Sequence, residues 1–457
     1  MRKRKNSLLG LLAVFTAFLI LVPCLGLGAP QKKINVLMIG FGEPSKYDAN
    51  AMQGWKNFLL NYMNAGMNML KMSFMYPMIT KVMIPMMDTG TILIDKNDPF
   101  ATTPKPNPQL IDAWTRPYNG KDYRFISVPE GEFPMLGPLF SYYLAPGGPG
   151  KGEPDFWEYV GLTMYEFYRT MDNYNPGGER EDRIYSETEK KLREQYGSNI
   201  VIDRGFGAAR PGYPHFQEAA QEIVKDGATE LVLAQNYVCF SEFENPAGEI
   251  EKEFKKKGID VNTAISGQIG GTAPYNLGVA KKANEELVNI PKESNVVVFL
   301  SHHGMFNVNM GLYDWTKEPY HEYAKVAFEG AKKAISDLEV VRSWDGKLEI
   351  WQVYAEFASG QYLSIDKAAA LAIEQGFDYV INIPFEVGNS GFETLIGLRG
   401  SWEREPGNWD EYVEDGLKKY KEEFNYNGLK VIITDGWIDG FVQGYVEQTS
   451  KAIDSLL

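Results

Sequence analysis

From residue 187 to the C-terminus, short apolar segments alternate regularly with amphipathic ones. Apolar runs of strand length lie at 199–203, 230–235, 295–300, 348–353, 379–383 and 429–434. Helical periodicity lies between them at 187–196, 214–225, 247–257, 320–338 and 366–375, with a closing helix that ends at Leu457. Strands that are apolar along their whole length are typical of parallel sheets covered by helices on both faces. The alternation therefore predicts an α/β fold.

The chain is too long for one ordinary domain at 457 residues, and the alternation divides into two similar halves. We therefore expect two doubly wound, Rossmann-like parallel-sheet domains that face each other across a cleft. The first should span 34–260 and the second 261–425. The strand and helix of 426–457 are expected to return to the first domain. An insertion at about 51–165 interrupts the first domain.

The insertion begins with a methionine-rich segment. Ten of the 17 methionines lie between Met52 and Met87, mostly three or four residues apart, which places them on one face of a helix. Residues 88–155 are rich in Pro, Gly and aromatic residues and indicate loops. Thioethers bind Cu(I), but flexible methionines more often line an adaptable apolar surface. The segment predicts either a lip of the cleft that contacts a membrane surface or a helix packed as core.

Residues 1–29 have the pattern of a signal peptide or membrane anchor. A basic start, MRKRKNS, precedes an unbroken apolar run at 8–22 and a stretch of small residues. The run is long enough to span a bilayer, and LVPC at 21–24 resembles a lipoprotein cleavage box. We expect an exported protein, periplasmic or otherwise extracytoplasmic. Release, a lipid anchor on Cys24 and a helix anchor are the alternatives.

Charge and cysteine content exclude several classes of function. Sixty acidic residues against 46 basic ones give a formal net charge of −14, so a nucleic-acid partner is not expected. The two cysteines, Cys24 and Cys239, exclude a disulfide framework, a zinc finger and an iron–sulfur cluster. Cys239 follows a predicted strand and is expected to be buried and inert.

Two of the four histidines follow the apolar strand NVVVFL directly, in Ser301-His302-His303-Gly304. Doubly wound folds bind ligands at the carboxyl ends of their strands, so this position favours a functional role. Adjacent side chains at a strand end point in opposite directions. We therefore expect only one of the two imidazoles to face the cleft.

A glycine-rich segment at 384–395, PFEVGNSGFETL, follows the strand YVINI. It brings Glu386 or Glu393 to the same edge of the predicted sheet. A carboxylate opposite an imidazole is suited to taking protons and to binding a divalent cation.

Several motifs of this sequence, taken in their order along the chain, resemble those of the ferrochelatases and related class II tetrapyrrole chelatases. VLMIGFGEPSK at 36–46 is similar to the opening strand and turn of the family, and SHHG resembles its S-x-H motif. WQVYAEFASGQYL at 351–363 is similar to the W-Q or F-Q-S stretch, and 384–395 resembles P-x-G-F-x-S-D-H-x-E-x-L. The resemblance covers 34–48 and roughly 170–457.

The resemblance implies a chelatase-like fold and the insertion of a divalent cation, Fe2+ or Co2+, into a tetrapyrrole such as a porphyrin. The metal is then a substrate, and no tightly bound cofactor is expected. The matching positions imply His303 and Glu393 as catalytic and metal-binding residues. Residues implied to bind the substrate are Phe41, Tyr237, His302 and Trp351.

The chain departs from the family pattern after the second glycine-rich motif. Ser390 and Gly391 stand where the motif has Asp-His, and Gly397 and Ser401 replace carboxylates of the acidic helix that follows. A non-catalytic tetrapyrrole- or haem-binding protein, or a metal-handling protein on the same fold, is therefore the alternative.

Overall fold

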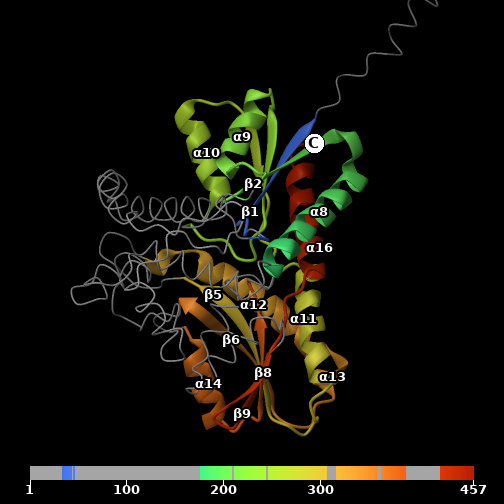
Figure 1. Ribbon diagram of the computed structural model, residues 1–457, viewed down its shortest axis with the longest axis vertical. Coiled ribbons are helices and arrows are strands. Elements are labelled where there is room, and N and C mark those ends of the chain that lie inside the picture. The colour runs from blue at the N-terminus through green and yellow to red at the C-terminus, as the bar shows by residue number, and fades with distance from the viewer. Residues whose placement is uncertain are drawn as a thin grey trace, which may run out of the picture.

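The computed structural model describes residues 33–43, 45–46, 175–207, 210, 212–242, 245–305, 315–357, 362–386 and 422–457. These residues form two β-sheets, and helices cover both faces of each sheet (Figure 1). The prediction of an α/β protein with two doubly wound parallel-sheet domains is confirmed. None of the described helices combines the length and the apolar character needed to cross a lipid bilayer.

The first sheet has the strand order β2-β1-β3-β4, and all of its pairs are parallel. Side chains alternate between its faces: Leu37 and Ile39 of β1 pack under α9 and α10, whereas Val36 and Met38 face α8 and α16. The elements of this domain are β1 (Ile34–Gly40), α8 (Pro176–Tyr196), η4 (Gly197–Asn199), β2 (Ile200–Phe206), α9 (Phe216–Lys225), β3 (Glu230–Gln235), α10 (Pro246–Lys257) and β4 (Asn262–Ile265).

The second sheet has the order β6-β5-β7-β9-β8, in which only the edge strand β8 is antiparallel. Val297 and Phe299 of β5 pack under α14, while Val298 and Leu300 face α11 and α12. Its elements are α11 (Ala273–Leu287), β5 (Val296–Gly304), η5 (Trp315–Lys317), α12 (Tyr320–Ser336), α13 (Glu339–Arg342), β6 (Leu348–Phe357), α14 (Ile365–Glu374), β7 (Tyr379–Pro384), β8 (Glu422–Tyr426) and β9 (Leu429–Ile433).

A single hydrophobic core joins the two domains. The C-terminal helix α16 (Asp439–Asp454) contacts α8 and β3 of the first domain and α11 of the second. The Tyr445 hydroxyl of α16 donates to the Ala234 carbonyl of β3 at 2.6 Å. On the other side of the junction, the Tyr275 hydroxyl of α11 donates to the Phe385 carbonyl after β7.

The structure corrects the expected domain boundaries in two places. The first sheet extends through β4, beyond the boundary expected at residue 260. The strand expected to return to the first domain is β9. It lies in the second sheet instead, because it pairs in parallel with β7, on the edge opposite β5. An Asn427-Gly428 turn with positive φ at both residues joins β9 to β8. Within 426–457, the described contacts with the first domain come from α16 and from Asp435 just before it, which pairs with Arg180 of α8 at 3.5 Å.

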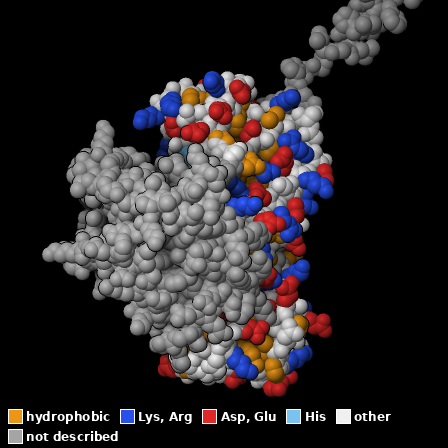
Figure 2. Space-filling view, viewed as in Figure 1, with side chains coloured by type: hydrophobic (Ala, Val, Ile, Leu, Met, Phe, Trp, Pro, Cys, Tyr) orange, Lys and Arg blue, Asp and Glu red, His pale blue; other side chains and the backbone are white. Residues whose placement is uncertain are grey.

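The predicted leader at 1–29 and almost all of the predicted insertion at 51–165, with its methionine-rich helix, lie outside the described residues. Over the visible part of the described surface, acidic and basic side chains are interspersed (Figure 2). On α8, several of them form pairs one helical turn apart, such as Arg193 with Glu189. Such exposed pairs stabilise a helix by only a few tenths of a kcal/mol each, roughly, so the fold depends on its apolar core.

We expect Gly178→Ala to destabilise the first domain. A Cβ at this position of α8 would lie 2.5 Å from the Ser45 backbone nitrogen and 2.8 Å from the Glu43 carbonyl oxygen, beyond β1. Backbone atoms cannot move aside as a flexible side chain does, so the cost should be about 1–3 kcal/mol. Thermal unfolding followed by circular dichroism measures the effect, with the exposed change Lys190→Ala in the same helix as control. Equal melting temperatures for both variants would contradict close packing of α8 on this segment.

Candidate functional site

The turn after β1 is held by a buried ion pair. The Gly42 backbone N–H donates to Glu181 Oε1 at 3.1 Å, and Arg210 donates to Glu181 Oε2 at 3.1 Å. Arg210 also donates to the Gly178 carbonyl at 2.7 Å. Burial raises the pKa of Glu181 despite the neighbouring guanidinium. These contacts fix the segment that carries Phe41, at the carboxyl end of the first sheet.

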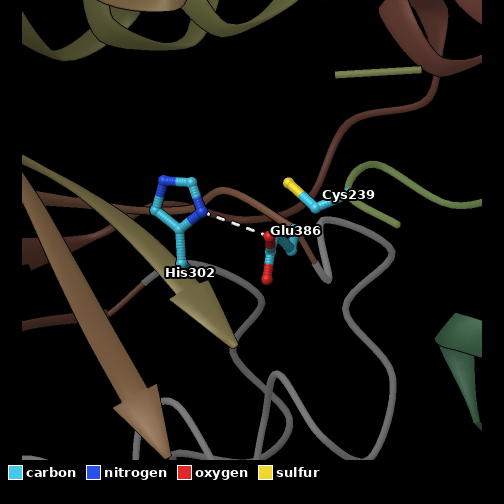
Figure 3. A group of neighbouring side chains, drawn as sticks. All are labelled: Cys239, His302 and Glu386. Carbon is cyan, nitrogen blue, oxygen red and sulfur yellow. Dashed lines mark hydrogen bonds and ion pairs between the residues drawn. The ribbon is translucent and has the colours of Figure 1, made fainter. Parts of the chain in front are cut away.

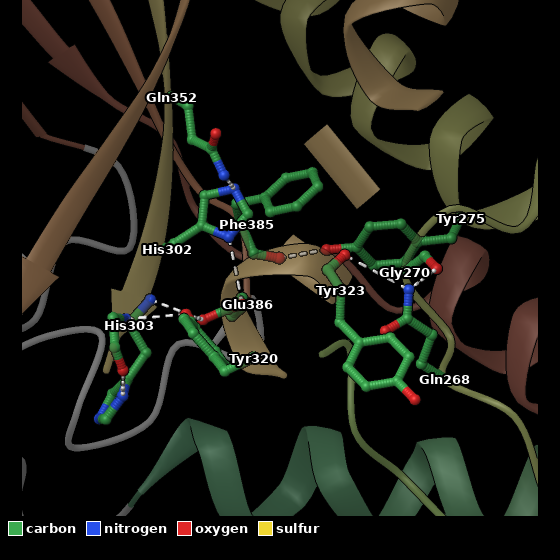
Figure 4. Close-up of polar contacts among 11 residues, drawn as sticks. Gln268, Gly270, Tyr275, His302, His303, Tyr320, Tyr323, Gln352, Phe385 and Glu386 are labelled. Carbon is green, nitrogen blue, oxygen red and sulfur yellow. Dashed lines mark hydrogen bonds and ion pairs between the residues drawn. The ribbon is translucent and has the colours of Figure 1, made fainter. Parts of the chain in front are cut away.

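In the second sheet, the carboxylate of Glu386 lies at the ends of β5 and β7 and accepts hydrogen bonds from several elements (Figure 4). Its Oε1 is 3.1 Å from His302 Nδ1. Its Oε2 accepts from the His303 backbone N–H at 2.7 Å and from the Tyr320 hydroxyl at 2.6 Å. Tyr320 begins α12, and its oxygen also accepts from the Gly304 N–H at 2.9 Å. The carboxylate therefore ties the end of β5 to α12.

These donors keep Glu386 ionised although it is buried. Burial alone would raise its pKa, but the electrostatic effect of His302 and the hydrogen bonds from His302, Cys239 and Tyr320 lower that pKa to about 2. Burial, together with the nearby Glu386 anion, raises the pKa values of the Cys239 thiol and the Tyr320 hydroxyl. Both groups therefore carry their protons and act as hydrogen-bond donors at neutral pH.

His302 is fully buried, and both of its ring nitrogens have partners. Its ring packs on Phe385 with centroids 4.6 Å apart. In the neutral ring, Gln352 Nε2 donates to His302 Nε2 at 3.3 Å, so Nδ1 holds the proton that His302 donates to Glu386. This pairing fixes both the tautomer and the orientation of the ring.

His303 points differently from its neighbour, as Figure 4 shows. Its side chain is partly exposed, and its Nδ1 lies 3.0 Å from the Gly304 carbonyl oxygen. The register between β5 and β6 shifts between His302 and Gly304, so the strand ends here in an irregular turn. The two imidazoles thus occupy different surroundings, one buried beside Glu386 and the other nearer the surface.

Cys239 reaches this group from the first domain (Figure 3). It follows β3, is 8% exposed, and offers its sulfur within 4.8 Å of the ligand atoms of His302 and Glu386. The carboxyl ends of the two sheets therefore meet at this point. The prediction that Cys239 is buried agrees with the structure, but its nearness to His302 and Glu386 was not foreseen.

No protein-family model matches the chain, and no curated protein matches its sequence significantly. Similar solved structures include SirB from Bacillus subtilis with Fe3+, at 13% identity and a TM-score of 0.36. Another is the sirohydrochlorin chelatase SirB from Bacillus subtilis subspecies spizizenii in complex with cobalt, at 9% identity and a TM-score of 0.34. Each match covers 60% of this chain and 89% of the other.

A periplasmic solute-binding protein of an ABC transporter from Actinobacillus succinogenes, with bound D-allose, is also similar. It has 12% identity and a TM-score of 0.25 over 61% of this chain and 88% of the other. At such identities and scores, these likenesses carry no information about the reaction.

The structure brings some of the predicted site residues to one place and not others. His302 and His303 lie at the end of β5, and Phe41 and Tyr237 lie partly buried just beyond β1 and β3 of the facing sheet. Trp351 lies elsewhere: it stacks on Phe299 at 5.7 Å and its Nε1 donates to Glu349. Glu393 lies outside the described residues.

Of the two glutamates that the sequence offered, Glu386 is the one seen beside the histidines. Tyr320 and Gln352 were not predicted as members of this group. Tyr320 opens a helix, a position without a local signal of such contacts. Gln352 is the glutamine of the W-Q stretch, which marked the position but not its contact with His302.

Glu386→Gln should make the stability of the protein less sensitive to acid. The pKa of Glu386 in the folded protein, about 2, lies below the usual value of 4.5. The ionised carboxylate therefore stabilises the folded state fully at pH values above 4.5. This contribution to the free energy of unfolding, on the order of 3 kcal/mol, is lost as the pH falls from the unperturbed pKa through the folded-state pKa of Glu386. Urea unfolding in EDTA from about pH 6 to about pH 2 measures it, with the exposed change Glu374→Gln as control. The same pH slope in wild type and Glu386→Gln would show that this carboxylate is not specially stabilised.

Tyr320→Phe should cost about 1–3 kcal/mol of unfolding free energy. It removes a donor from a buried carboxylate and leaves the Gly304 N–H without its acceptor. Tyr323→Phe is the matched control, because Tyr323 is on the same helix and is 38% exposed. Urea unfolding at neutral pH compares the two, and an equal loss in both variants would contradict the role given to Tyr320.

Proposed function

We propose that this protein is a chelatase of the class II type, which inserts a divalent cation, Fe2+ or Co2+, into a tetrapyrrole such as a porphyrin. The observation that carries the proposal is the pairing of β5 with β7. The two strands are parallel neighbours, in register from Val296 with Tyr379 to Ser301 with Pro384. The SHHG motif and the glycine-rich segment that starts at Pro384 therefore leave the sheet side by side. The resemblance to the chelatases requires this juxtaposition.

The proposed reaction exchanges two pyrrole protons for one divalent cation. A proton acceptor must lie near the macrocycle, and an imidazole serves this purpose near neutral pH. We assign this role to His303, because it is the less buried member of the pair and matches the family histidine. Glu393 is assigned as its carboxylate partner from the same resemblance. The metal and the tetrapyrrole are both substrates, and the reaction needs no tightly bound cofactor.

The contacts around His303 support its assignment as the proton acceptor, with Glu386, Tyr320 and His302 as the residues that position it. Glu386 accepts from the His303 backbone N–H, and Tyr320 accepts from the next N–H along the chain. These bonds fix the strand end on which His303 stands. His302, which the resemblance offered as a substrate contact, is fully buried and is better assigned to holding Glu386 in place. Phe41 and Tyr237, beyond the strands of the first sheet, would contact the macrocycle with their aromatic rings.

Export belongs to the same proposal and rests on the sequence of residues 1–29. The chain would then act outside the cytoplasm, either released or held at the membrane by a lipid or a helix. A membrane surface near the site would suit a poorly soluble tetrapyrrole substrate.

His303→Ala should lower the rate of metalloporphyrin formation by about 100-fold or more, as expected for the loss of a general base. The purified protein is incubated with a porphyrin and Fe(II), Co(II) or Zn(II), and the visible spectrum is followed. His215→Asn is the matched control, since His215 caps α9 in the first domain and asparagine preserves a cap.

Three outcomes of this assay would contradict the proposal. Full activity of His303→Ala with loss in a folded His302→Ala variant would mean that the wrong histidine was assigned. A shifted porphyrin spectrum without turnover in the wild type would indicate a tetrapyrrole-binding protein instead. No response to porphyrin would leave metal handling as the function.

A further inference from the structure

Three side chains that bind metals in proteins converge from separate parts of the chain. Cys239 follows β3 of the first sheet, His302 lies near the end of β5, and Glu386 follows β7 (Figure 3). Each offers one ligand atom, and these atoms all lie within 4.8 Å of one another. All three are almost fully buried: His302 is 0%, Cys239 8% and the Glu386 side chain 7% exposed.

We propose that Cys239, His302 and Glu386 hold a resident Zn2+ ion at the junction of the two domains. A thiolate, an imidazole and a carboxylate are the three ligand types that zinc uses in proteins. A soft sulfur ligand selects against Mg2+ and Ca2+, which take oxygen ligands. The proposal goes beyond the chelatase reaction, in which the metal is a substrate.

The distances suit one shared ion. Two nitrogen or oxygen ligands of a tetrahedral zinc are roughly 3.3 Å apart, because each lies about 2.0–2.1 Å from the metal. His302 Nδ1 and Glu386 Oε1 are 3.1 Å apart. A tetrahedral zinc places its sulfur ligand about 3.5 Å from the nitrogen and oxygen ligands, so the sulfur has to approach by no more than roughly 1.3 Å, a shift that a side-chain rotation supplies.

Charge also favours the ion. With the Cys239 thiolate and the Glu386 carboxylate as ligands, a divalent cation makes the buried group neutral, and burial of a net charge is costly. Binding releases the thiol proton. The proton on His302 Nδ1 is lost and another is taken up at Nε2, so one proton leaves for each ion bound to the neutral ring.

The surrounding residues provide the outer contacts that such ligands usually have. Glu386 would bind the metal through Oε1, while Oε2 keeps its hydrogen bonds from Tyr320 and the His303 backbone. Gln352 already contacts His302 Nε2 at 3.3 Å. After its amide turns, its oxygen accepts the proton that Nε2 gains, which fixes the tautomer needed for Nδ1 to bind the ion.

The test uses the purified full chain, stripped with EDTA and titrated with Co(II), without porphyrin. We expect the tightest site to take one Co(II) per chain, with a near-ultraviolet sulfur-to-cobalt charge-transfer band and the strong visible absorption of a four-coordinate ion that Zn(II) abolishes. Cys239→Ser should remove the charge-transfer band and weaken Co(II) binding at least tenfold. Cys24→Ser is the matched control and should keep the band, as should His303→Ala.

Circular dichroism and thermal unfolding show whether Cys239→Ser is folded, and His302→Gln gives an independent loss of affinity. The proposal is overturned if the wild type shows no charge-transfer band or if Cys239→Ser retains it. It is also overturned if His303→Ala loses the band, because the ion would then lie at the proposed catalytic histidine. Since no tetrapyrrole is present, failure here leaves the chelatase proposal untouched, and failure of the porphyrin assay leaves this one untouched.

Discussion

A buried carboxylate needs several hydrogen-bond donors, and the arrangement around Glu386 follows from that need. Its donors come from the side chain and backbone of β5, from the first residue of α12, and from Cys239 in the other domain. Removing any one of them leaves a buried anion less well compensated. One side chain therefore links the strand end, the helix and Cys239 of the other domain, within a junction that the shared hydrophobic core holds together.

The alternation of strands and helices was sufficient to predict both sheets, because fully apolar strands such as β3 and β5 have few alternative environments. It failed for β4, whose four residues are not an apolar run and are half-exposed. The place of β9 also escaped prediction. The Asn427-Gly428 turn is a strong hairpin signal, yet it says nothing about which sheet offers a free edge to the hairpin.

The site was predictable to the extent that it depends on strand ends. The histidine pair and the segment at Pro384 follow neighbouring strands, and the alternation of side chains indicated that the two imidazoles would differ. The direction of the His302 ring could not be derived, because it depends on Glu386 and Gln352, which lie far from it in the sequence. Cys239 joins the group only through the packing of one domain on the other, which no local pattern encodes.

The C-terminal helix α16 has a consequence for how the chain is made. Its Tyr445 packs on Tyr185 and donates to Ala234, both in the domain that is synthesised first. During translation, the part of the first sheet that α16 covers stays exposed until residues 439–454 have emerged, after the whole second sheet. The first sheet is therefore made before the second but is fully covered only after it, and its uncovered apolar surface is prone to aggregation until then.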